Sequence, residues 1–221
     1  LWSHLRPAVV ANFPTPPGPP EPAAYLARVG EIYTHDAYHS LSIEGYQVTP
    51  ELIARIASDD WNPEADPQDQ NQRNAMAAKG YHEAFTRVTQ SVGRILSGAP
   101  APATLARDLP DWYRALFSPS VQAGVIPAHA LAGFRNRPVF IRGSEHVPPP
   151  HEAVTELIDT LFALLADEPH AGVRAVLGHF LFVYIHPYPD GNGRVGRFLM
   201  NAFLASGGYP WTVIRVEHRQ A

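Results

Sequence analysis

Residues 186–197 read His-Pro-Tyr-Pro-Asp-Gly-Asn-Gly-Arg-Val-Gly-Arg and join two apolar segments. The preceding segment, 170–185, is apolar on nearly every face, which predicts a helix buried within a bundle. That helix must end at His186, because the proline that follows disfavours helical geometry in the residue before it. A second helix is expected from about Gly193 to the glycine pair at 207–208. The stretch therefore predicts a stiff turn between two core helices.

This turn gathers residues suited to holding a phosphate chain. The Gly191–Gly193 segment permits positive φ, so successive N–H groups can converge on an anion at a helix N-terminus. Arg194 and Arg197 lie three residues apart and share a helix face. Asp190 offers the oxygen ligand that Mg²⁺ takes alongside phosphates. His186 belongs to the residue type whose ordinary pKa, about 6.5, suits a general base near neutrality. The combination predicts transfer from a nucleoside triphosphate.

The same stretch resembles the signature of the Fic (filamentation-induced-by-cAMP) family, H-x-F-x-D/E-G-N-G-R-x-x-R. It matches at every position but one, because Tyr188 stands where phenylalanine is usual. The resemblance covers about residues 21–216 and implies an all-α helical bundle with a small β-hairpin flap. It also implies a protein adenylyltransferase, which transfers AMP from ATP to a Ser, Thr or Tyr hydroxyl of a target protein.

The resemblance further implies a role for each matching residue. His186 deprotonates the target hydroxyl, which attacks the α-phosphorus as pyrophosphate leaves. Asp190 holds Mg²⁺ on the α- and β-phosphates. Arg194 contacts the β-phosphate and Arg197 the γ-phosphate. An anion hole, with its asparagine near the α-phosphate, consists of Gly191, Asn192 and Gly193.

Residues 134–143 differ in kind from the rest of the chain. They are short, β-branched and aromatic and are bounded by turn residues, which predicts a β-hairpin. The segment resembles the flap of the Fic family, which docks the backbone of the target as an added strand. The residues expected to do so are Arg137, Pro138, Val139, Phe140, Ile141 and Arg142.

An earlier stretch, Ser40-Leu41-Ser42-Ile43-Glu44-Gly45, resembles the inhibitory-helix pattern of the family, S/T-x-x-x-E-G/N. A glutamate at a helix end can pair bidentately with an arginine. If Glu44 pairs with Arg197, the γ-phosphate loses its anchor and the enzyme is autoinhibited. The pattern-bearing residues are Ser40, Glu44 and Gly45. The alternative is an ordinary helix end with Gly45 as its cap. Some family members also remove AMP with this glutamate, and the pattern does not separate the two activities.

Composition excludes several other classes. The 221 residues include no cysteine, so there is no disulfide framework, thiolate zinc site or cysteine nucleophile. A net charge of −4 argues against a broad basic surface for nucleic acid. Seven of the 23 prolines lie within the first 22 residues, which predicts an extended, polyproline-like arm. Two histidines at i, i+4, His35 and His39, lack an evident third ligand for zinc.

We therefore expect a Pro-rich arm over residues 1–20, N-terminal helices with the inhibitory motif over 21–60 and a Fic core over 61–221. The expected partners are ATP with Mg²⁺ and a hydroxyl-bearing target protein, or the chain itself. A homodimer stays open, nucleic acid is expected only through a flanking domain, and no membrane association is expected in a cytoplasmic protein. The rival hypotheses are a Fic-fold enzyme that removes AMP or uses another donor, and a non-catalytic nucleotide sensor.

Overall fold

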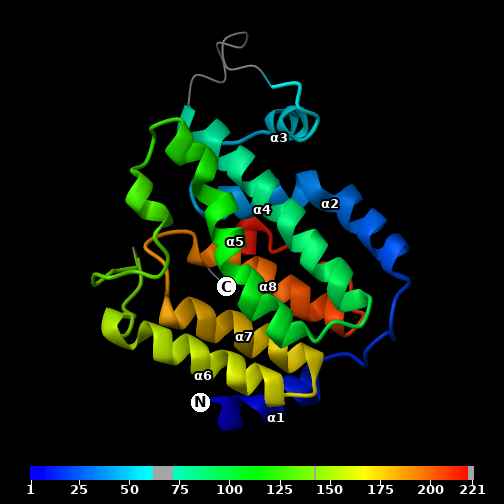
Figure 1. Ribbon diagram of the computed structural model, residues 1–221. Helices are drawn as coiled ribbons and strands as arrows, with labels where there is room; N and C mark the ends of the chain where they lie inside the picture. The colour runs from blue at the N-terminus through cyan, green and yellow to red at the C-terminus, as the bar shows by residue number, and fades with distance from the viewer. Residues whose placement is uncertain (62–71, 142, 219–221) are drawn as a thin grey trace. The chain divides into compact units, whose positions relative to one another are not determined.

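The computed structural model describes residues 1–61, 72–141 and 143–218, and within them every regular element is a helix (Figure 1). The all-α prediction is therefore confirmed. No helix among these residues is both long and apolar enough to cross a bilayer.

The chain forms two compact units, and each combines segments that are distant in sequence. The first contains Leu1–Pro22, Ser91–Leu109 and Gly133–Trp211. The second contains Ala23–Gln90, Pro110–Ala132 and Thr212–Ala221. The boundaries expected near residues 20 and 60 stay a prediction.

In the first unit, helix α7 packs on both α6 and α8. Their bounds are Val154–Asp167 for α6, Ala171–Ile185 for α7 and Asn192–Ser206 for α8. Helix α8 is buried along almost its whole length. The helix predicted to lie buried within a bundle is α7, which packs on α1 (Trp2–Asn12), α6 and α8. One side of α7 departs from this prediction, because about two fifths of each of Val176, Phe180 and Tyr184 is exposed.

The proline-rich head also differs from its prediction, because Trp2–Asn12 form helix α1, which packs on α7 (Figure 1). Arg6 binds the buried Glu168 through two hydrogen bonds of 2.7 and 3.0 Å. Phe13 lies against Gly172, and a Cβ atom added to Gly172 would stand only 2.4 Å from the phenyl ring of Phe13. The head is thus an integral part of the first unit, since side-chain contacts with the unit fix it in place.

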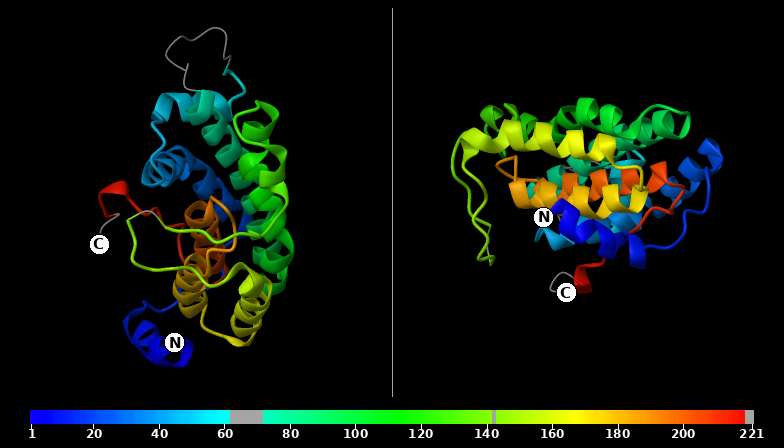
Figure 2. Two further views of the ribbon diagram at one scale, coloured as in Figure 1. Left: turned by 90° about the vertical axis from the view of Figure 1, so that its left-hand side faces the viewer. Right: turned by 90° about the horizontal axis from the view of Figure 1, so that it is seen from below.

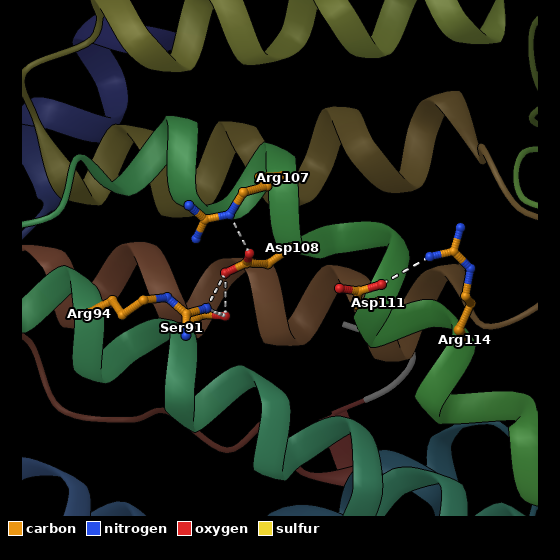
Figure 3. Close-up of polar contacts among 6 residues, drawn as sticks. All are labelled: Ser91, Arg94, Arg107, Asp108, Asp111 and Arg114. Atoms are coloured by element: carbon orange, nitrogen blue, oxygen red, sulfur yellow. Dashed lines mark hydrogen bonds and ion pairs between the residues drawn. The ribbon is translucent and has the colours of Figure 1, made fainter.

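A polar cluster joins the segments of α4 (Gln72–Leu96) and α5 (Ala101–Gln122) that belong to the first unit (Figure 3). The Asp108 carboxylate accepts hydrogen bonds from Ser91, Arg94 and Arg107 at 2.7, 2.5 and 2.8 Å. Burial raises the pKa of Asp108, but these donors outweigh it and hold the pKa below its ordinary value.

The second unit contains α2 (Pro22–Ile43), α3 (Pro50–Ala57) and the first part of α4. Thr49 caps α3 by accepting a 3.2 Å hydrogen bond from the backbone N–H of Leu52. Tyr81 of α4 donates a 2.7 Å hydrogen bond to the buried carboxylate of Asp36 in α2. A pairing of this kind offsets the cost of burying both polar groups.

The β-hairpin prediction is wrong for the described part of residues 134–143, which contains no strand. Figure 2 shows this part of the chain as a long loop. Two features oppose a ladder here: Pro138 has no N–H to donate, and a lone two-stranded hairpin is only marginally stable in water. Arg142 lies outside the described residues.

Candidate active site

The end of α7 places His186 in an unusual backbone conformation. His186 has φ 54° and ψ 58°, the left-handed region, and its N–H donates to the carbonyl of Phe182. Residues other than glycine enter this region at a steric cost, so the surrounding contacts must hold it there. The following proline prevents the helix from continuing.

The imidazole of His186 is oriented by its own helix. Its Nδ1 atom lies 3.2 Å from the carbonyl oxygen of Val183. A carbonyl can only accept, so Nδ1 carries the proton. In the neutral ring the lone pair is therefore on Nε2, the nitrogen available to act as a base.

Asn192 closes the turn between the two helices. Its side-chain oxygen accepts from the backbone N–H of Tyr188 at 2.9 Å, and its amide nitrogen donates to the carbonyl of Tyr188 at 2.8 Å. Gly191 precedes α8 with φ 80°, a conformation that favours glycine. The side chain of Asn192 thus fastens the loop, a task that the sequence pattern did not indicate.

A carboxylate and two arginines lie at the start of α8. Asp190 Oδ1 accepts from the N–H of Gly191 at 2.6 Å, and its Oδ2 lies 3.5 Å from Nη2 of Arg194. The side chain of Arg194 is 1% exposed, whereas that of Asp190 is 62% exposed. Arg197 is also buried. The α7–α8 turn and the first two turns of α8 therefore contain most of the predicted residues: a histidine, an exposed carboxylate, two buried arginines, Gly191 and Gly193.

Arg197 also acts on the neighbouring helix. Burial lowers the pKa of His179 in α7, a hydrogen bond with the Gly196 backbone partly opposes this, and the positive charge of Arg197 adds a smaller lowering. At Gly196 a Cβ atom would stand 3.1 Å from Nδ1 of His179, so α7 and α8 approach closely here. Burial therefore disfavours the charged form of His179 where the two helices approach.

Sequence reasoning missed Arg135, which it placed only within the expected hairpin. The Arg135 guanidinium donates to the carbonyls of Ile185 and His186 at 3.3 and 2.8 Å, and Arg135 is 4% exposed. Burial lowers its pKa, and the charge of Glu152 partly opposes this. No local pattern marks this arginine, because its partners lie about 50 residues later in the chain.

The predicted flap residues form part of a loop. Phe140 is 80% exposed, Arg137 and Pro138 are exposed, and Val139 and Ile141 are half-buried. The carbonyl of Arg137 accepts a 3.3 Å hydrogen bond from Arg135.

The predicted inhibitory motif forms the end of α2 in the second unit. Ser40 is buried, and Glu44 is the half-buried residue that follows the last helical residue. Gly45 has φ 85°, and its N–H donates to Ser42 while that of Tyr46 donates to Leu41. These are the two hydrogen bonds of a Schellman cap, so the predicted cap of Gly45 is confirmed.

Metal ligands are sparse in the part of the chain that the structure describes. No group of three or more His, Cys, Asp or Glu side chains there is arranged to hold a metal. The His35 and His39 rings are 4.5 Å apart, but Nδ1 of His39 accepts a hydrogen bond from the N–H of Val216. A single exposed carboxylate, Asp190, remains at the α7–α8 turn, and it can contribute one ligand to a cation held mainly by phosphates.

The α7–α8 turn lies within a region that is similar to a known protein family. A model of the Fic/DOC family matches residues 103–204, which include the whole α7–α8 turn. The chain carries a Fic/DOC family domain. Its matches include "Protein adenylyltransferase Fic" of Nematostella vectensis, 41% identical over 96 residues, and a probable protein adenylyltransferase of Aquifex aeolicus, 44% identical over 78 residues. These alignments cover 42% and 34% of this chain, and only 22% and 24% of the two relatives.

Solved Fic proteins share the fold over nearly the whole chain. Fic-1 from C. elegans matches with a TM-score of 0.68 and 21% identity, covering 99% of this chain and 59% of that protein. A Fic-domain signaling protein from Bacteroides thetaiotaomicron matches with a TM-score of 0.62 and 18% identity, covering 99% and 78%. The Fic domain thus lies within a fold that extends beyond residues 103–204.

Proposed function

We propose that this chain is a protein adenylyltransferase, which transfers AMP from ATP to a hydroxyl of a target protein. The observation that carries the proposal is the α7–α8 turn. It joins a histidine whose Nε2 holds the lone pair to two buried arginines at a helix N-terminus. The names of the relatives support the same chemistry.

In the proposed reaction His186 Nε2 accepts the proton of the target hydroxyl. The hydroxyl oxygen then forms a bond to the α-phosphorus, the bond from that phosphorus to the bridging oxygen breaks, and pyrophosphate leaves. Arg194 and Arg197 hold the β- and γ-phosphates, and the Gly191–Gly193 backbone at the start of α8 surrounds the α-phosphate. Asn192 contributes by fixing this backbone, since both ends of its amide bind Tyr188.

Asp190 fits a role as the protein ligand of Mg²⁺ in this site. Its carboxylate is exposed, and Mg²⁺ bound with a nucleotide takes most of its ligands from phosphate and water. The bound ion supplies positive charge that stabilises the leaving pyrophosphate. The contact with Arg194 keeps the carboxylate close to the phosphate-binding arginine.

Autoinhibition by Glu44 belongs to the same proposal. Glu44 carries a negative charge at the C-terminal end of α2, where the helix dipole disfavours it. The proposed task of Glu44 is competition with the γ-phosphate for Arg197. The segment 137–142 receives the backbone of the target, and the boundary near residue 60 separates the inhibitory helices from the catalytic core.

The test compares ATP labelled at the α-phosphate with ATP labelled at the γ-phosphate, in the Glu44→Gly variant with Mg²⁺. We expect protein-bound label from the α position only. Label from the γ position would indicate a kinase, and label from neither, with ATP still bound, would leave the chain as a nucleotide sensor. Both outcomes contradict the proposal.

A further inference from the structure

The C-terminal end of α7 is held by side chains from outside the helix. The last carbonyls of a helix lack partners within it. Here the carbonyl of Phe182 accepts from the N–H of His186, and that of Tyr184 accepts from His146 Nε2 at 2.8 Å. The next two carbonyls, of Ile185 and His186, accept from the guanidinium of Arg135. The backbone around the proposed base thus depends on Arg135.

Arg135 also contacts the residue after His186. The backbone N–H of Arg135 donates to the carbonyl of Pro187 at 2.8 Å. Three successive carbonyls, 185 to 187, are therefore bound by one residue. These three hydrogen bonds explain how His186 keeps the left-handed backbone conformation. A residue other than glycine adopts this conformation only when its surroundings impose it.

The same guanidinium reaches both ends of the loop that contains the proposed flap. It donates to the carbonyl of Arg137 at 3.3 Å and to that of Pro149 at 2.5 Å. These two residues bracket the loop between them. Arginine presents five N–H donors in a planar fork, and four carbonyls use them here. A lysine has the charge but not the fork.

We propose that Arg135 is a positioning residue, which fixes the backbone of His186 and ties it to the loop that receives the target. The proposal rests on the adenylyl-transfer function for its kinetic consequence only. Its structural consequence is that the His186 imidazole carries its proton on Nδ1, and this can be measured without any enzymatic activity. Rotation of the His186 backbone moves Nδ1 away from the Val183 carbonyl, and the ring then loses the contact that selects its tautomer.

The test uses Arg135→Gln and Arg135→Lys in the full chain. The matched control is Arg114→Gln, because Arg114 is exposed and pairs only locally with Asp111 at 2.9 Å. Imidazole ¹⁵N NMR reports the tautomer of His186, assigned through its loss in a His186→Gln sample. We expect the Nδ1–H form in the wild type and the control, and a mixture of tautomers in both Arg135 variants.

The kinetic arm measures ATP affinity and single-turnover AMP transfer in the Glu44→Gly background. We expect transfer to fall by about 100-fold in Arg135→Gln, the size of effect that a misplacement of about 1 Å produces, while ATP affinity is unchanged. Unchanged His186 signals in both variants would overturn the proposal. An equal loss of ATP binding and AMP transfer would also overturn it, as would an unfolded Arg135→Lys protein. Either result would show that Arg135 supports the fold in general and not the position of His186 in particular. If the parent transfers no AMP, the NMR result still decides the proposal while the proposed function fails.

Discussion

Two helices of this chain end on a residue with a proposed function, but they end in different ways. Helix α2 ends before Glu44 in a Schellman cap, which uses backbone hydrogen bonds and the positive φ of Gly45. Helix α7 ends at His186, which itself has positive φ, and side chains from distant segments bind its carbonyls. The first end is encoded locally, whereas the second depends on the tertiary structure.

The first comparison tests whether the ends of α2 and α7–α8 act on one another through Glu44 and Arg197. Arg197→Ala removes the proposed γ-phosphate anchor, and we expect AMP transfer to fall by about 100-fold through weaker ATP binding. If Glu44 inhibits by pairing with Arg197, Glu44→Gly raises transfer in the wild type but not in the Arg197→Ala background. The four proteins of this cycle are compared by transfer rate and ATP affinity. An equal rise in both backgrounds would show that Glu44 acts elsewhere.

The contrast between tertiary and local contacts also holds within α5 (Figure 3). Asp108 binds Ser91 and Arg94 of α4, whereas Asp111 pairs only three residues along its own helix with Arg114. We expect Asp108→Asn to lower the free energy of unfolding by about 1.5–3 kcal/mol at pH 7. For the exposed Asp111→Asn the expected loss is below about 0.5 kcal/mol. Urea unfolding measures both.

The stabilisation that the Asp108 carboxylate provides depends on pH in a defined direction. Because the folded pKa of Asp108 is lowered, its contribution is fully present above its ordinary value of 3.8 and is lost as the pH falls through the folded pKa. The difference in the free energy of unfolding between the wild type and Asp108→Asn therefore becomes smaller as the pH falls. A gap that widens below pH 4 would contradict the assignment of the carboxylate as ionised and paired.

The cap of α2 can be tested with two glycines of the same region. Gly45 has φ 85°, whereas Gly30 lies inside α2, where a Cβ atom meets nothing within 4 Å. We expect Gly45→Ala to destabilise the chain by about 1–2 kcal/mol, because alanine is disfavoured at positive φ. Gly30→Ala should stabilise it by about 0.5–1 kcal/mol through helix propensity. Thermal unfolding of both variants measures the difference, and the same sign in both would contradict a local cap.

The smallest expected effect concerns the charge of Glu44. Removal of a carboxylate from the C-terminal end of a helix favours the helix dipole, so Glu44→Gln should raise the free energy of unfolding by about 0.3–1 kcal/mol. Lower stability would mean that the contacts of the Glu44 carboxylate outweigh the effect of the helix dipole. The measurement is urea unfolding at low salt, where the dipole is least screened.

These comparisons explain how much could be predicted from the sequence. The helical fold, the cap at Gly45 and the turn that brings Asp190 to Arg194 depend on residues close in the chain, so their patterns were legible. The helix at Trp2–Asn12 and the grip of Arg135 depend on partners far away, so no local pattern encoded them. The hairpin prediction was wrong for a related reason, because the β-propensity of one segment does not supply a partner strand.

The most direct test of the central claim is removal of the proposed base. With α-labelled ATP and Mg²⁺, Glu44→Gly is compared with Glu44→Gly/His186→Ala, and with Glu44→Gly/His129→Ala as a control at an exposed histidine. We predict that loss of His186 lowers AMP transfer by about 10²–10⁴-fold at unchanged ATP affinity, and that the control has no effect. Transfer that persists without His186 would contradict the account.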